Sequence, residues 1–137
     1  MRRVGWMLLS VALSACLLTA ATDPFVGTWR LNVRKSKYAP GTCPKSMIIE
    51  MTTAGNGVKY RSETTLSNGR TTQSTYTADY NGTEAIVSTG AGLMAPVSLQ
   101  RTDDHTVVAS YKRGMQVIAS SRRVVSKNGR EMTVTTV

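Results

Sequence analysis

From Phe25 onward, apolar and polar residues alternate along the chain with a period of two. Every second residue from Phe25 to Val33 is apolar or glycine, whereas most of the residues between them are polar. The runs 46–53 and 58–66 repeat this alternation. Because successive side chains of a β-strand point to opposite faces, the pattern predicts strands that are buried on one face and exposed to solvent on the other. Helical spacing accounts for none of these runs.

Short turn sequences separate the runs. Asparagine and glycine tolerate the positive φ of tight hairpin turns, and an Asn-Gly pair between alternating runs is a strong hairpin signal. These signals are Gly55-Asn56-Gly57, Ser67-Asn68-Gly69, Asn81-Gly82, Arg113-Gly114 and Asn128-Gly129. The chain is therefore expected to form no helix and nine strands, near residues 25–33, 46–53, 58–66, 70–80, 84–89, 96–102, 106–113, 116–126 and 130–137.

The predicted fold class is all-β, an antiparallel up-and-down meander forming one domain over residues 22–137. Such a meander closes into a barrel or folds into two packed sheets. We favour the barrel, because closure removes exposed strand edges and about eight strands leave room for packed side chains or one small ligand. Several polar residues share the inward parity, so the interior should be partly polar: Ser62, Thr64, Thr72 and Ser74.

The N-terminus has the pattern of a signal peptide. Two arginines precede an apolar run from Val4 to Leu18 that is short for a membrane span, and small residues lead up to Ala21. We expect cleavage after Ala21, with residues 1–21 removed and the domain periplasmic or secreted. In an alternative reading, Leu13-Ser14-Ala15-Cys16 is a lipoprotein site, which would anchor the domain to a membrane by a lipid on Cys16.

The chain is basic, with a formal net charge of +9 at pH 7. Such a charge favours anionic partners, including nucleic acid. However, the cations are spread along the chain, aromatic residues are not interleaved with them, and the chain is predicted to be exported. We therefore expect no nucleic-acid partner and interpret the charge as a solvated basic surface.

Gly27-Thr28-Trp29, near the start of the first strand, resembles the opening motif of the lipocalin and wider calycin barrels. The longer stretch from Asp23 to Tyr38 is similar to the opening of small exported bacterial proteins of lipocalin-like type. The resemblance implies a barrel in which Gly27 and Trp29 belong to the core that closes one end. It also implies a small hydrophobic or amphipathic ligand inside.

The chain also departs from this family pattern. We match neither the C-terminal helix of lipocalins nor their late arginine, which packs on the motif tryptophan. Similar bacterial proteins continue through one further strand, whereas this sequence ends at Val137. The barrel is therefore expected to be incompletely closed at its C-terminal strand, or completed there by a neighbour.

Two arginines stand out because strand parity points them inward. Arg101 shares its parity with Leu99, and Arg123 shares its parity with Val125. A buried guanidinium needs a partner, and a ligand carboxylate or phosphate would serve. The tyrosines that could add a hydroxyl are Tyr60, Tyr76, Tyr80 and Tyr111. In the alternative, both arginines lie near strand ends and pair with internal acids such as Glu63 or Asp79.

We find no pattern of catalytic, metal-binding or cofactor-binding residues. The one histidine, His105, follows Asp103-Asp104 in a predicted turn, and turn chemistry accounts for all three. A hydrolase would require two acids that face each other in a cleft.

The leading hypothesis is an exported, non-enzymatic, lipocalin-like domain that binds a small amphipathic ligand through Arg101 or Arg123. The ligand's apolar part would contact Leu31, Ile49, Val97, Leu99 and Val117. The alternative is a structural or interaction module of the cell envelope with a filled core and a basic surface. Such a module would contact an envelope partner, or its own copy through the C-terminal edge strand.

Overall fold

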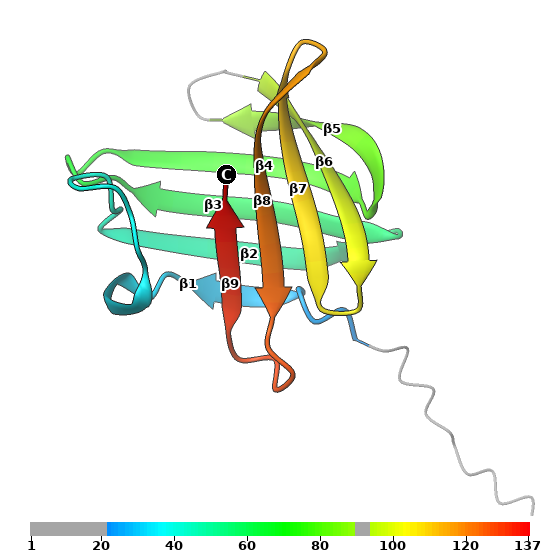
Figure 1. Ribbon diagram of the computed structural model, residues 1–137, viewed down its shortest axis with the longest axis horizontal. Helices are drawn as coiled ribbons and strands as arrows, with labels where there is room; N and C mark the ends of the chain where they lie inside the picture. The colour runs from blue at the N-terminus through cyan, green and yellow to red at the C-terminus, as the bar shows by residue number, and fades with distance from the viewer. Residues whose placement is uncertain (1–21, 90–93) are drawn as a thin grey trace, which may run out of the picture.

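The computed structural model describes residues 22–89 and 94–137, so the predicted signal peptide and Cys16 lie outside the described residues. The described residues form nine strands in one antiparallel sheet, each strand paired with the next (Figure 1). They are β1 (Gly27–Arg30), β2 (Ser46–Ala54), β3 (Gly57–Thr65), β4 (Thr71–Asp79), β5 (Asn81–Thr89), β6 (Met94–Asp103), β7 (Thr106–Arg113), β8 (Gln116–Val125) and β9 (Met132–Thr136). The predicted all-β meander is confirmed.

The sheet folds over on itself. In Figure 1, β2, β3 and β4 run across the view, β7, β8 and β9 run up and down, and β5 curves between the two groups. The inner faces of β8 and β4 lie opposite each other across the barrel, as the hydrogen bond from Arg123 to Tyr76 shows. The result is a nearly closed barrel with one unsealed seam, since no backbone pairing joins β1 to β9 in the described residues. The expected incomplete closure at the C-terminal strand is confirmed.

The first strand is shorter than predicted. It covers Gly27–Arg30, and a 3-10 helix, η1 (Val33–Lys35), occupies the end of the predicted run 25–33. The Asn32 side chain accepts a hydrogen bond from the Lys35 amide at 3.2 Å and so caps this helix. A local side-chain to backbone bond therefore overrides the alternation here and forms a short helix that the sequence pattern does not indicate.

A meander places successive connections at opposite ends of the barrel. The end that we call the N-terminal rim carries residues 22–26 and the turns β2–β3, β4–β5, β6–β7 and β8–β9. The other end, the C-terminal rim, carries the turns β3–β4 and β7–β8 and the last residue, Val137.

The apolar core lies toward the N-terminal rim. Its fully buried members include Phe25, which precedes β1, and four residues that lie near the ends of their strands at that rim or in mid-strand, namely Val58, Leu99, Val107 and Val125. Gly57 begins β3 there and has no room for a side chain, because a Cβ atom would collide with the Ala78 carbonyl oxygen. This rim is therefore densely packed.

The segment before β1 covers the N-terminal rim. Phe25 is 1% exposed, and its carbonyl accepts a hydrogen bond from the Trp29 indole at 2.9 Å. Asp23 accepts a hydrogen bond from the Tyr80 hydroxyl at 2.5 Å and forms an ion pair with Arg101 at 2.9 Å. These contacts fix residues 22–26 across the barrel end.

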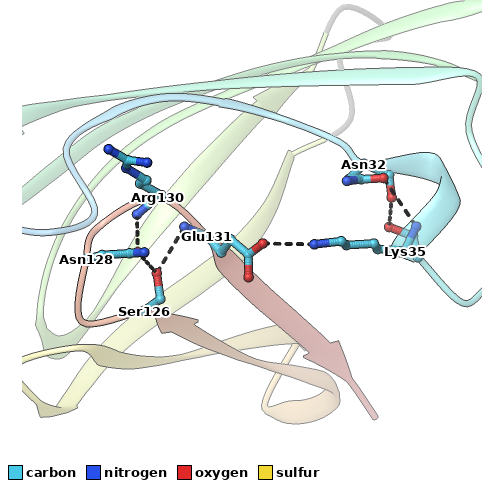
Figure 2. A network of polar contacts seen from close by, with 7 residues as sticks. Asn32, Lys35, Ser126, Asn128, Arg130 and Glu131 are labelled. Carbon is cyan, nitrogen blue, oxygen red and sulfur yellow. Dashed lines mark hydrogen bonds and ion pairs between the residues drawn. The ribbon is translucent and has the colours of Figure 1, made fainter.

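One ion pair bridges the seam. Lys35 of η1 contacts Glu131, just before β9, with 3.0 Å between Nζ and Oε1 (Figure 2). The Glu131 backbone is held by the Ser126 hydroxyl, which itself donates to the Asn128 side chain. Both charged side chains are about two-thirds exposed (71% and 67%), so the pair is expected to contribute less than about 1 kcal/mol. The seam is thus bridged by side chains rather than sealed by a strand ladder.

Candidate functional site

Arg123 occupies the interior of the barrel. It lies on β8 opposite Val107 of β7 and shares its face with Ser121 and Val125, both of which are buried. Only 5% of the residue is exposed. Strand alternation accounts for this inward position, since every second residue of this part of β8 is buried.

Three tyrosines surround the Arg123 guanidinium. Nη1 donates to the Tyr76 hydroxyl at 3.0 Å, and Nη2 donates to the Tyr111 hydroxyl at 3.2 Å. The guanidinium carbon lies 5.3 Å from the centre of the Tyr60 ring, within range of a cation–π interaction. In the described part of the chain, no carboxylate forms an ion pair with Arg123.

The tyrosines come from both halves of the barrel. Tyr60 and Tyr76 are directly opposite each other in the β3–β4 register, and their rings stack with centroids 4.5 Å apart. Tyr111 lies on β7, which belongs to the other group of strands. The folding of the sheet therefore assembles a cluster whose members are far apart in the sequence.

A cavity adjoins this cluster on the side toward the C-terminal rim. Its volume is about 270 Å³, and its lining residues are Tyr60, Ser62, Ser74, Tyr76, Val87 and Tyr111. Since one water molecule takes about 30 Å³ of liquid volume, the space corresponds to roughly nine water-sized groups. Aromatic faces and hydroxyl groups share the lining, which suits an amphipathic molecule.

The polar interior agrees with strand parity at three of four positions. Ser62 and Thr64 are buried and Ser74 is half-buried, as expected for inward residues. Thr72 is exposed, contrary to the expectation. It lies near the start of β4, close to the turn at the C-terminal rim.

Arg123 is a cation at neutral pH, because a guanidinium keeps its proton in proteins. Burial by itself would lower the pKa of Arg123, but the oxygens of Tyr76, Tyr111 and Tyr60 together raise it. Burial raises the pKa of Tyr76 to about 12, although the nearby guanidinium partly opposes this shift. Burial also raises the pKa of Tyr60. At neutral pH the cluster is one cation beside neutral phenols.

The O–H groups of Tyr76 and Tyr111 are unused hydrogen-bond donors among the described residues. A phenol oxygen carries one proton and two lone pairs, and Arg123 donates to a lone pair of each oxygen. No described residue accepts a hydrogen bond from either hydroxyl. Both O–H groups can therefore donate to an acceptor in the cavity, and the positive charge behind them strengthens that donation.

Arg101 lies apart from this cluster. It pairs with Asp23 at the N-terminal rim, and its guanidinium lies 4.3 Å from the centre of the Tyr80 ring. The alternative of pairing with an internal acid therefore describes Arg101, but the acid is Asp23 rather than Glu63 or Asp79. The structure thus brings Arg123 together with Tyr60, Tyr76 and Tyr111 and separates Arg101 from them.

The other predicted contacts fall outside the cavity lining. Trp29 is half-buried against the core, whereas Gly27 is exposed. Val97 and Leu99 are buried in the core. Val117 is 50% exposed, because a register shift between Tyr111 and Lys112 disturbs the parity of β8 near the hairpin tip. Val87 lines the cavity instead, and the sequence marks it only as the inward member of a short alternating run.

The high pKa of Tyr76 predicts a loss of stability at alkaline pH. Its folded-state value of about 12 exceeds the ordinary value of 10.0, so the unfolded chain loses this proton first. Its contribution to stability is complete below pH 10 and is lost as the pH rises through about 12. Urea unfolding across this window should show a smaller decline for Tyr76→Phe than for the wild type. Equal declines in the two proteins would refute the assignment.

Within residues 22–89 and 94–137, no group of three or more His, Cys, Asp and Glu residues is placed to hold a metal ion. No helix of the described residues is long and apolar enough to cross a membrane. Comparison with protein-family models, curated proteins and solved structures gives no match for this chain.

Proposed function

We propose that the barrel binds a small amphipathic acid, with its carboxylate against the Tyr76 and Tyr111 hydroxyls and its apolar part in the cavity. The observation that carries this proposal is the buried charge of Arg123, which no carboxylate balances among the described residues. A buried cation is costly unless it is paired, and a bound anion would pair it through the two tyrosines.

The geometry favours a planar acid over a neutral ligand. The two tyrosine hydroxyls that flank the guanidinium can each donate to one carboxylate oxygen, in the way that a forked donor binds a carboxylate. An amide has only one oxygen to accept from the two hydroxyls, and it carries no negative charge to balance the cation behind them. Hydrogen bonds that involve a charged group contribute about 1.5–3 kcal/mol. We therefore expect an acid to bind about 10- to 100-fold more tightly than its amide.

The cavity volume limits the size of the ligand. A volume of about 270 Å³ is just below the usual range of small-molecule sites, which begins at about 300 Å³. The stacked Tyr60 and Tyr76 rings offer an aromatic wall for a flat or short apolar group. A short aryl or alkyl monocarboxylate fits this space, whereas a long acyl chain would extend out of it. Such a domain would be lipocalin-like in function and exported, as residues 1–21 suggest.

Calorimetric titration with 3-phenylpropanoate and 3-phenylpropanamide tests the proposal. The wild type should bind the acid more tightly than the amide. The double variant Tyr76→Phe/Tyr111→Phe keeps both rings but loses both hydroxyls, and should bind the two compounds with similar affinity. Arg122→Met is the matched control, because Arg122 neighbours Arg123 on β8 but is exposed.

Three results would contradict the proposal. The wild type could bind acid and amide with equal affinity. The double variant could keep the preference for the acid. Finally, neither compound could release or absorb heat with the wild type. A preference lost in Arg122→Met as well would point to surface charge rather than to the barrel interior.

A further inference from the structure

The tip of the β7–β8 hairpin exposes large apolar side chains. Met115 is 99% exposed, Ile118 is 54% exposed and Val117 is 50% exposed. Figure 1 shows this hairpin, in orange, extending beyond its neighbours at the C-terminal rim. Single apolar residues are common on protein surfaces, but three of them within four positions of one protruding tip form a patch that needs an explanation.

Neither neighbouring strand covers the tip. Pairing between β6 and β7 ends at Val97 and Tyr111 in the described residues. Pairing between β8 and β9 ends at Ser121 and Thr136, with two further backbone hydrogen bonds between Ser120 and Val137. Residues 112–118 therefore form a two-stranded ribbon that turns at Gly114, which has a φ of 61°. A ribbon of this kind gains little stability from its own contacts. Its apolar side chains do not serve the barrel core.

The charge of the hairpin is positive throughout. The sequence from Thr106 to Arg130 contains no aspartate or glutamate. At the tip, Lys112 pairs with Glu84 on β5 at 2.6 Å, whereas Arg113 is exposed and forms no ion pair with any described residue. An exposed cation thus lies beside the apolar tip, with no acidic residue in the hairpin to oppose it.

We propose that this tip docks on an anionic phospholipid surface. Met115, Val117 and Ile118 would enter the boundary between headgroups and acyl chains, and Arg113 would contact lipid phosphates. Apolar side chains flanked by cations are the pattern that such a surface selects. A second copy is a poor occupant, because two tips of equal positive charge would repel each other and each is too narrow for a stable interface.

This surface is separate from the proposed ligand site but close to it. Tyr111, which lines the cavity, is the last β7 residue paired with β6 before the ribbon begins. Docking at the tip would therefore bring the cavity side of the barrel near a bilayer, where amphipathic acids partition. The docking itself requires no ligand.

A fluorescent label at the tip tests the docking. Cys43 is a free cysteine, and Cys16 is the other cysteine of the chain. In the full chain with Cys16→Ser and Cys43→Ser, Met115→Cys is therefore the single labelling position for the environment-sensitive dye NBD. Asn128→Cys, in the exposed β8–β9 turn at the opposite rim, is the matched control. With vesicles of equal parts phosphatidylglycerol and phosphatidylcholine, the label at 115 should shift to the blue and brighten severalfold. Pure phosphatidylcholine and high salt should weaken the effect.

The labelled position separates tip docking from other modes of association. Attachment through the apolar run of residues 1–21 would leave a label at 115 in water, and so would overturn the proposal. An equal shift at 128 would also overturn it, as would a shift without vesicles that grows with protein concentration and so reports self-association. The absence of any shift would do the same.

Val117→Ser/Ile118→Ser in the Met115→Cys background should abolish the shift. Both residues are exposed, so far-UV circular dichroism should be unchanged. Retention of the full shift in this variant would count against the proposal. The ligand proposal is tested by titration with 3-phenylpropanoate in the absence of vesicles, and the docking proposal is tested with vesicles in the absence of this ligand. Each proposal can therefore fail independently of the other.

Discussion

Replacing Arg123 with methionine is expected to abolish the preference for 3-phenylpropanoate over its amide, while leaving the fold at least as stable as the wild type. The preference should disappear because the charge that bonds to the two cavity hydroxyls is removed. Stability should hold because an unbalanced buried cation opposes folding, and exchange of buried charge for an apolar group of similar size is often neutral or stabilising by about 1–4 kcal/mol. Titration calorimetry and thermal unfolding measure the two effects.

Two further variants sharpen this prediction. Arg123→Lys keeps the charge but cannot fork to both tyrosines, so it should retain only part of the preference. Arg122→Met removes the neighbouring exposed charge and should change neither quantity by more than a small amount. A drop in stability of more than about 3 kcal/mol in Arg123→Met would instead show that Arg123 holds the fold together.

Replacing Phe25 with alanine should destabilise the protein by about 3–5 kcal/mol. Phe25 is 1% exposed at the N-terminal rim, where the centroids of its ring and the Tyr80 ring lie 6.3 Å apart. The variant would leave a cavity beneath the segment that Asp23 ties to Arg101. A loss of this size is a large fraction of the ~5–15 kcal/mol that stabilises an ordinary domain. Urea unfolding monitored by circular dichroism gives the difference.

Val33→Ala is the control for this substitution. Val33 is 44% exposed in η1, so its truncation should change stability by less than about 0.5 kcal/mol. A loss below about 1 kcal/mol for Phe25→Ala would show that residues 22–26 are not part of the packed core.

Most of the fold can be predicted from local sequence because strand alternation and Asn-Gly turns are local signals. They predict the ends of all nine strands to within three residues, but the first strand has less than half its predicted length. There, the Asn32 side chain competes with the strand for the backbone and forms η1 instead. The register shift between Tyr111 and Lys112 was equally hidden, since a bulge changes parity without a distinctive residue type. Val117 was placed inward for that reason.

The site could be predicted only in part. Alternation identified Arg101 and Arg123 as inward, but their environments differ because Asp23 lies beside one and not the other. Asp23 precedes the first strand and lies 78 positions from Arg101 in the chain, so no local pattern links the two residues. Parity predicts that Ser62 and Ser74 point inward, and both line the cavity. Val87 also lines the cavity, but the sequence does not identify it as a site residue.

Local sequence is enough to predict that this chain forms an antiparallel sheet, where it turns, and which face of most strands is exposed to solvent. These properties follow from the period of two and from the backbone freedom of asparagine and glycine. The environment of each inward arginine, in contrast, depends on the folded barrel, which places an acid beside Arg101 and three tyrosines beside Arg123. Alternation sets the side of a strand that a residue occupies, whereas its height in the barrel depends on the combined register of all the strands.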